Sequence, residues 1–339
     1  MAARMSSRLM RSVLVGEKGS LTIVNDTPLP SLKTGQILIK VAACGVNRMD
    51  LLQRYNKYPV PVGESEILGV EVAGTIAEMD EEALHHSNFK VGDRVCALVG
   101  GGGYADFCAS PHQTVMPIPR SMSFVEASAI PEAFLTAYAA MFLSAKLKKD
   151  ESILIHAGAS GVGTAAIQLA KEFGNKDIFV TAGSEKKLAM CRELGATTLI
   201  NYKTHDFAEV VRHTTNKRGV DVVVDFIGAS YWERNIKSLA LDGRLVLLGL
   251  LGNTATDGIH CNTGLILAKR LTIIGSTLRN RDINYKSNLI LDFTRSTVDG
   301  FQKGRLKPVL DSTYTIEEVE AAHDRMLRNL NSGKIVLTM

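Results

Sequence analysis

Residues 153–171 read ILIHAGASGVGTAAIQLAK, and this stretch decides the class of fold. A continuous apolar run enters a glycine-rich turn, and a helical pattern opens directly after it. Glycines make such a turn tight, so the backbone can approach a pyrophosphate, while the helix N-terminus adds oriented N–H groups and a positive dipole end. A merely structural glycine turn is the alternative. The strand–turn–helix context favours dinucleotide binding, by Gly158, Ser160, Gly161 and Val162.

One position of this turn departs from the usual G-x-G-x-x-G pattern. Ser160 stands where the middle glycine is expected, between Gly158 and Gly163. A small residue still permits a close approach of the backbone to phosphate. We expect the Ser160 hydroxyl to lie where a nicotinamide or a substrate would meet it.

The chain after residue 152 alternates apolar strands with helical patterns. Its strands are short and lack strict alternation of polar and apolar residues, as a parallel sheet covered on both faces requires. Strand–helix alternation of this kind predicts a doubly wound α/β sheet. The expected strands lie at 152–158, 177–183, 198–202, 220–228, 244–252 and 270–276, with helices at 163–174 and 184–195.

The first part of the chain has a different character. Short β-branched runs separated by Gly, Pro, Asn and Asp predict an antiparallel, barrel-like domain, with strands at 12–17, 21–26, 36–46, 74–79 and 92–99. The last strand, within 333–339, is expected to return to this first domain. We therefore expect a mainly β substrate domain over 1–130, completed by 283–339, with a dinucleotide-binding domain at 131–282 inserted in it.

The second strand of the nucleotide domain indicates which dinucleotide binds. An NAD enzyme usually carries Asp or Glu about 20 residues past the glycine turn, to hold the ribose 2′-hydroxyl. Here the strand ends in TAGSEKKL, residues 181–188, with no acid at the strand end itself. A 2′-phosphate needs room, a hydroxyl and a cation, so we predict NADPH, held by Gly183, Ser184, Lys187 and Tyr202. The alternative is that the lysines form a solvated helix face.

Composition excludes several other classes of protein. The 339 residues carry a net charge of +4 without a dense Lys/Arg block, so nucleic acid is not expected as a partner. We see no apolar run near the ~20 residues of a membrane span. Five widely spaced cysteines without a CxxC pair indicate a reducing compartment. Arg4, Arg8 and Arg11 give the N-terminus the look of a short mitochondrial presequence, but a cytoplasmic location is our prediction.

The chain resembles the medium-chain dehydrogenase/reductase superfamily, and within it the zinc-independent quinone oxidoreductase branch. The resemblance begins near Arg11 and rests on runs such as NRMDLLQR, ILGVEVAG, GDRVCALVGGGGYADF, LIHAGASGVGTAAIQLAK, TAGSEKKL and GKIVL. It implies a Rossmann sheet inserted in a GroES-like substrate domain.

Two positions of this resemblance concern metal. Zinc-dependent relatives carry a ligand Cys in a CGVCHxD-like run and a ligand His in GHE. Here the runs are CGVNRMD and LGVEVAG, so Asn47 and Val70 replace the ligands, and we expect no metal. Without a Lewis acid, a conjugated acceptor such as a quinone suits the site better than an alcohol.

The resemblance also implies the residues of the site. Tyr58 and Ser160 would line the substrate, and Tyr58 could donate a hydrogen bond or proton to a quinone oxygen. A surface-loop role is the alternative for Tyr58. The cofactor would be contacted through its nicotinamide, ribose or phosphates by Asn47, Thr136, Gly249, Leu250, Leu278 and Lys334.

Three functions follow from this pattern. The first is NADPH-dependent reduction of quinones, ortho-quinones in particular. The second is NADPH-dependent reduction of enoyl or alkenal substrates, which shares the fold and cofactor. The third is a non-enzymatic NADPH-binding protein. We also expect a homodimer, because a β-branched edge strand at 270–276 could pair with a second copy.

Overall fold

The computed structural model describes residues 8–252 and 262–339. It divides into two compact units, each described here by itself. Unit 1 comprises residues 1–132, 279–298 and 307–339, and unit 2 comprises residues 133–278 and 299–306. The second unit is thus an insertion in the first along the chain.

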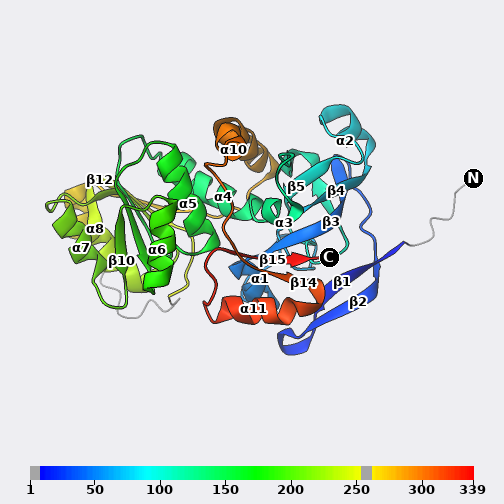
Figure 1. Cartoon of the computed structure of the whole chain (residues 1–339), viewed down its shortest axis with the longest axis horizontal. Coiled ribbons are helices and arrows are strands. Elements are labelled where there is room, and N and C mark those ends of the chain that lie inside the picture. The colour runs from blue at the N-terminus through cyan, green and yellow to red at the C-terminus, as the bar shows by residue number, and fades with distance from the viewer. Residues whose placement is uncertain (1–7, 253–261) are drawn as a thin grey trace, which may run out of the picture. The chain divides into compact units, whose positions relative to one another are not determined.

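Unit 2 contains one parallel sheet of six strands in the order β10-β9-β8-β11-β12-β13. Strands β10 and β12 of this sheet are labelled in Figure 1. Every residue of the central strands β8 and β11 is buried, which explains their unbroken apolar sequence. The predicted doubly wound sheet is therefore confirmed. Its strands are β8 (Ile153–Ile155), β9 (Ile178–Ala182), β10 (Thr198–Asn201), β11 (Val220–Asp225), β12 (Leu239–Leu247) and β13 (Thr272–Gly275).

Helices cover this sheet as two groups. Helices α5 and α6 contact each other, while α8 contacts both α7 and α9, as expected for layers on opposite faces of a doubly wound sheet. They are α5 (Gly161–Glu172), α6 (Glu185–Leu194), α7 (Phe207–Thr214), α8 (Trp232–Ser238) and α9 (Thr263–Lys269). Helix α4 (Pro131–Tyr138) begins at Pro131, where a missing N–H costs nothing, and continues as a π-helical turn, Ala139–Ser144.

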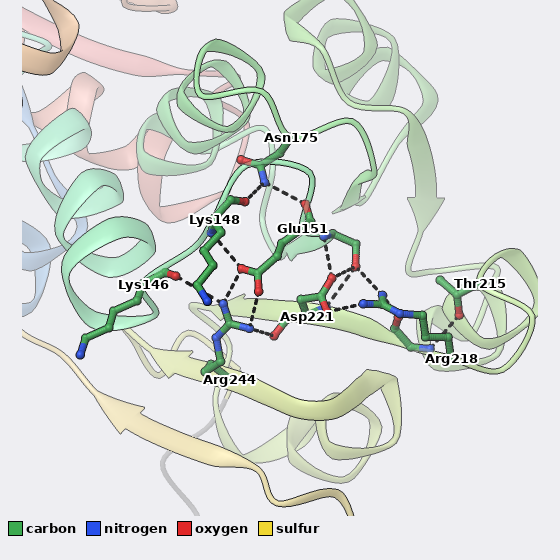
Figure 2. Close-up of polar contacts among 10 residues, drawn as sticks. Lys146, Lys148, Glu151, Asn175, Thr215, Arg218, Asp221 and Arg244 are labelled. Carbon is green, nitrogen blue, oxygen red and sulfur yellow. Dashed lines mark hydrogen bonds and ion pairs between the residues drawn. The ribbon is translucent and has the colours of Figure 1, made fainter.

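A polar network joins segments at the amino ends of the central strands (Figure 2). Arg244 donates to both carboxylate oxygens of Glu151, at 3.1 and 2.6 Å, and to the carbonyl of Ala145. Asp221 accepts from the backbone and hydroxyl of Ser152 and pairs with Arg218. These contacts connect the strands at the amino edge of the sheet, whereas parallel sheets of this kind bind ligands at the carboxyl edge.

Unit 1 contains a seven-stranded sheet, with β14-β15-β3-β4-β5-β7 in order and β6 beside β3, and a separate β1-β2 hairpin. Strand β15 pairs antiparallel with β3 and parallel with β14, so the C-terminal strand does return to the first domain, as predicted. The strands are β1 (Leu9–Val15), β2 (Leu21–Pro28), β3 (Gln36–Val46), β4 (Glu71–Met79), β5 (Arg94–Leu98), β6 (Phe107–Pro111), β7 (Val115–Pro117), β14 (Leu310–Thr315) and β15 (Lys334–Thr338).

The helices of unit 1 are mostly short. They are α1 (Arg48–Arg54), α2 (Glu81–His86), α3 (Phe124–Ala127) and α11 (Val319–Leu327); the longer α10 (Ile283–Gln302) begins in this unit. The core collects apolar side chains from distant strands, among them Val13, Ile39, Val95 and Leu337.

Three details differ from the sequence-based expectations. Residues 299–306 belong to unit 2, because Arg305 pairs with Glu172 at 2.7 Å and Phe301 packs on Phe134 with ring centroids 5.2 Å apart. The sequence pattern predicted neither helix α10 nor strands β6 and β7. Strand β1 begins at Leu9, earlier than predicted.

The N-terminal leader lies partly outside the described residues, since Arg4 falls within 1–7. Its other two cations serve the fold: Arg8 pairs with Glu78, and Arg11 pairs with Asp106 and Glu317. These pairs give Arg8 and Arg11 a structural use that does not depend on targeting.

One helical stretch is more apolar than the sequence analysis allowed. Phe124–Ser144 is long and apolar enough to cross a membrane by length and composition alone. However, 78% of its most apolar window is buried inside the protein, as in a core helix. This stretch is therefore weak evidence for a membrane span.

Candidate active site

The glycine turn in unit 2 has the geometry of a phosphate cradle. A side chain at Gly158 would collide with Val180, and one at Gly163 would collide with the carbonyl of Ala157, so both positions require glycine. Helix α5 starts immediately after the turn, and the first N–H groups of a helix, here those of Gly161 and Val162, have no acceptor within it. Oriented N–H groups and the helix dipole fit an anionic pyrophosphate.

Ser160 has a structural role that the sequence did not show. Its hydroxyl oxygen accepts a hydrogen bond from the N–H of Gly163 at 3.0 Å, so Ser160 is the N-cap of α5. The residue is partly exposed, and whether its hydroxyl also borders a substrate stays a prediction. Any substitution of Ser160 will therefore change helix capping as well as the surface of the turn.

The ends of β9 and β10 bring the predicted 2′-phosphate residues together. A Cβ at Gly183 would lie 2.7 Å from the Tyr202 hydroxyl and 3.3 Å from Cε of Lys203. Ser184 caps helix α6 by accepting from the N–H of Lys187 at 3.4 Å. Lys203 is an exposed cation that the sequence analysis missed; its place directly after Tyr202 was the available clue.

The acid that could have opposed a phosphate here has a partner. The Glu185 carboxylate accepts from the Asn201 side chain at 3.1 Å. Glu185 and Asn201 also line a cavity of about 320 Å³, together with Arg192, Leu199 and His205 among others. The contact occupies the carboxylate that directly precedes Lys186 and Lys187 in the sequence.

Three of the remaining predicted cofactor residues of unit 2 follow strands of the sheet, and the fourth lies on a helix. Gly249 and Leu250 follow β12, where the N–H of Leu251 donates to the carbonyl of Phe226 beyond the end of β11. Leu278 follows β13 and is buried, and Thr136 lies on α4. Parallel strands place all their carboxyl ends at one edge, which is where such sheets bind ligands.

Unit 1 contains a buried ion pair next to Asn47. The ammonium of Lys334 donates to Glu71 Oε1 at 2.5 Å, to Asn47 Oδ1 at 2.6 Å and to the carbonyl of Val46 at 3.1 Å. Glu71 also accepts from the Asn47 amide at 2.9 Å and from the backbone N–H of Glu132 at 2.8 Å. We call Glu71, Lys334 and Asn47 the buried charge cluster.

This cluster bears on the predicted roles of Asn47 and Lys334. Lys334 is 4% exposed and uses all three ammonium donors within unit 1, and Asn47 is 9% exposed. A contact of Lys334 with a cofactor would require one of these hydrogen bonds to be given up. Glu71, in the quoted run LGVEVAG, was not among the predicted residues, although its carboxylate organises the cluster.

Tyr58 has charged neighbours in unit 1. The guanidinium carbon of Arg279 lies 5.6 Å from the centre of the Tyr58 ring. Burial raises the pKa of the Tyr58 phenol, the Glu132 carboxyl adds to the rise, and Arg279 opposes it. Burial, reinforced by Glu71, raises the pKa of Glu132 to about 7. Tyr58 therefore stays protonated at neutral pH and can act as a donor.

Comparisons with known proteins agree with these features. A zinc-binding dehydrogenase family model matches residues 161–293, and an alcohol dehydrogenase GroES-like domain model matches residues 33–120. Quinone oxidoreductase of Rattus norvegicus is 31% identical over 98% of this chain and 98% of its own length. The chain belongs to the medium-chain dehydrogenase/reductase family. Membership assigns it to a group of oxidoreductases.

Solved structures of this family superpose on nearly the whole chain. A mycobacterial protein complexed with NADPH is 26% identical with a TM-score of 0.85, covering 97% of this chain and 100% of that one. CurK enoyl reductase is 28% identical with a TM-score of 0.81, covering 97% and 99%.

The zinc-ligand positions of the family can now be tested against the geometry. Asn47 presents an amide engaged by Lys334 and Glu71, and Val70 is a buried aliphatic residue, 1% exposed. The Lys334 ammonium holds the amide oxygen of Asn47, and Val70 offers no donor atom, so these two residues do not fit the ligand set of a catalytic zinc. Across residues 8–252 and 262–339, no group of three or more His, Cys, Asp or Glu side chains could hold a metal.

Proposed function

We propose that this chain is an NADPH-dependent, zinc-independent quinone oxidoreductase, with ortho-quinones as its preferred acceptors. The observation that carries the proposal is that Asn47, which stands in the sequence at a zinc-ligand position of the zinc-dependent relatives, has its amide held by Lys334 and Glu71 within the buried charge cluster. An alcohol needs its alkoxide stabilised by a Lewis acid, whereas a quinone already accepts a hydride into its conjugated system. The likeness to quinone oxidoreductase over nearly the full chain supports the same substrate class.

Unit 2 would hold the cofactor, which supplies the hydride when bound. The N–H groups of Gly161 and Val162 would bind the pyrophosphate. Gly158 lies in the same turn, at a position where any side chain would collide with Val180. Ser184, Lys187 and Tyr202 would surround a 2′-phosphate. The related mycobacterial protein that binds NADPH supports this choice of cofactor.

Tyr58 would donate to the acceptor oxygen from unit 1. Its raised pKa keeps the phenol protonated at neutral pH, as a proton donor requires. Asn47 would lie near the nicotinamide ribose and Thr136 near the carboxamide, while Gly249, Leu250 and Leu278 would close around the nicotinamide. Lys334 would reach the cofactor by giving up one of its three hydrogen bonds in the buried charge cluster. Ser160 would border both nicotinamide and acceptor.

A second candidate is reduction of a carbon–carbon double bond in an enoyl or alkenal substrate. The structural likeness to CurK enoyl reductase favours it. This reaction also places a hydride on a conjugated system and negative charge on a carbonyl oxygen. The two candidates differ only in the acceptor.

The deciding experiment measures oxidation of NADPH and NADH against a panel of acceptors. The panel contains 9,10-phenanthrenequinone, 1,4-benzoquinone and a 2-alkenal, each with and without a chelator. We expect NADPH oxidation with quinones, fastest with the ortho-quinone, and no effect of the chelator. Preference for the 2-alkenal selects the second candidate. NADPH binding without turnover of any acceptor selects a non-enzymatic role, and activity lost on chelation contradicts zinc independence.

We also propose a cytoplasmic homodimer. Strand β13 is the edge of the unit 2 sheet, and Leu267 on the preceding helix α9 is 80% exposed. Pairing two such edges would hide both features from water. Sedimentation at micromolar concentration should give twice the 36.7 kDa of one chain, and a single-chain mass would contradict the dimer.

A further inference from the structure

Arg279 carries a buried guanidinium whose Nη1 nitrogen has no hydrogen-bond partner among the described residues. The residue is 3% exposed. Its Nε and Nη2 both donate to the carbonyl of Gly100, at 2.9 and 2.6 Å, whereas Nη1 is buried and has no hydrogen-bond partner among the described residues. Buried polar groups in proteins are nearly always satisfied, so an exception of this kind needs an explanation.

The guanidinium is held firmly in place. Lys286, itself 9% exposed, donates from its ammonium to the backbone carbonyl of Arg279 at 2.7 Å. The side chain is fixed at its other end by the two bonds to Gly100. A charged donor fixed in this way costs no reorganisation when charge develops near it.

Tyr58 places a second donor beside this cation. The Arg279 guanidinium carbon lies 5.6 Å from the Tyr58 ring centre. Tyr58 is half-buried and lies in the segment between α1 and β4, which forms neither helix nor strand. Tyr58 thus lies in a loop segment, whereas the Arg279 side chain is anchored to Gly100.

We propose that Nη1 of Arg279 binds the carbonyl oxygen of the acceptor and stabilises the oxyanion that forms there, with the Tyr58 phenol as the partner donor. The inference rests on the proposed function and extends it with a residue that takes over the electrostatic role of a metal.

The step balances as follows. One carbonyl oxygen of the quinone would take a hydride, with its electron pair, from the bound reduced cofactor, which would form the first hydroquinone O–H and leave the cofactor oxidised. An electron pair of the conjugated system would move onto the other carbonyl oxygen, and Arg279 would balance this charge. A proton from Tyr58 would then form the second O–H, and water would return a proton to Tyr58.

The acids in this neighbourhood are compatible with an oxyanion. Glu132 has a pKa of about 7 because of burial and the adjacent Glu71, so its charge is only partly developed at neutral pH. The Glu64 side chain packs against Gly100, whose carbonyl anchors Arg279. Arg279 and Lys286 supply the opposing positive charge.

The first test compares Arg279→Gln with Arg281→Gln. Arg281 is two residues away, exposed, and stacked over Tyr285, so it is a matched control. Loss of one fixed oxyanion donor lowers kcat by about 100- to 1000-fold. We expect that loss in kcat for Arg279→Gln with the quinone, a smaller change in KM, unchanged NADPH binding, and wild-type kcat for Arg281→Gln. A kcat within twofold of wild type in Arg279→Gln overturns the inference.

The second test needs no turnover. 4-Nitrophenol is titrated with pH in the presence of the protein, and its phenolate is followed by absorbance. A fixed cation favours the phenolate, so the pKa of the bound probe should fall by about 1 unit or more in wild type. The fall should persist in Arg279→Lys, which also serves if Arg279→Gln does not fold, and should vanish in Arg279→Gln.

The two tests separate the inference from the proposed function. A chain that shifts the probe through Arg279 but oxidises NADPH with no acceptor supports the oxyanion site and contradicts the enzyme. A chain that reduces quinones while the probe shifts equally in wild type and Arg279→Gln contradicts the oxyanion site alone.

Discussion

Replacing Lys334 with Met should destabilise unit 1 severely. The ammonium is 4% exposed and makes three hydrogen bonds, so its loss leaves the Glu71 carboxylate buried without a countercharge. Asn47 Oδ1 and the carbonyl of Val46 also lose their donor. Breaking a buried ion pair by removing one partner costs about 3–5 kcal/mol, and we expect Lys334→Met to lie in this range.

The double variant Glu71→Gln/Lys334→Met tests the cause. It removes both charges, so the buried uncompensated carboxylate is gone and only hydrogen bonds are lost. The cost should fall to about 1–2 kcal/mol, at about 1 kcal/mol for each hydrogen bond not replaced. The two substitutions should therefore be strongly non-additive, as expected for residues in direct contact.

Urea unfolding followed by far-UV circular dichroism gives the free energies, and amide hydrogen exchange in β3 and β15 locates the change in unit 1. Arg328→Met is the control, because Arg328 and Asp324 form an exposed pair worth about 0–1 kcal/mol. If Lys334→Met costs no more than this control, the ion pair does not stabilise the fold as the geometry implies.

The remaining predictions concern unit 2. Lys187→Ala should weaken NADPH binding about 10- to 150-fold, equivalent to roughly 1.5–3 kcal/mol, with little effect on NADH; equal losses measured by titration calorimetry would contradict the 2′-phosphate assignment. Ser160→Val should lower quinone turnover on the order of 100-fold, because the larger side chain displaces the nicotinamide. Ser160→Ala should mainly lose the N-cap of α5, at a cost of about 1 kcal/mol of stability. If Ser160→Val turns over quinone as fast as wild type, Ser160 does not belong to the active site. Arg244→Met should lower the stability of unit 2 by about 1.5–3 kcal/mol, because the partly buried Glu151 loses a bidentate partner. Urea unfolding followed by the fluorescence of Trp232, the single tryptophan of the chain, should show a lower midpoint. An unchanged midpoint would argue against a stabilising role of the network in Figure 2.

Local sequence was enough to predict the nucleotide-binding half of the molecule. Short sequence patterns predicted three features: the glycine turn, the apolar strands β8 and β11, and the return of β15 to the first domain. Turn chemistry and strand burial depend on residues a few positions apart, and therefore remain visible without a structure. The same holds for Tyr202, which follows the next strand and lies beside Gly183.

Tertiary structure alone decided which charged groups meet. Lys334 and Glu71 are 263 positions apart, and no pattern in either segment indicates their hydrogen bond. Tyr58 and Arg279 meet in the same way, since they come from a loop after α1 and from the segment before α10. The capping role of Ser160 was also visible only in the structure, where its hydroxyl oxygen accepts a hydrogen bond from the N–H of Gly163 in helix α5. A buried charge without a partner is costly, so polar groups in the core must be paired. Which groups pair depends on contacts between residues that are distant in the sequence, and these contacts exist only in the folded chain.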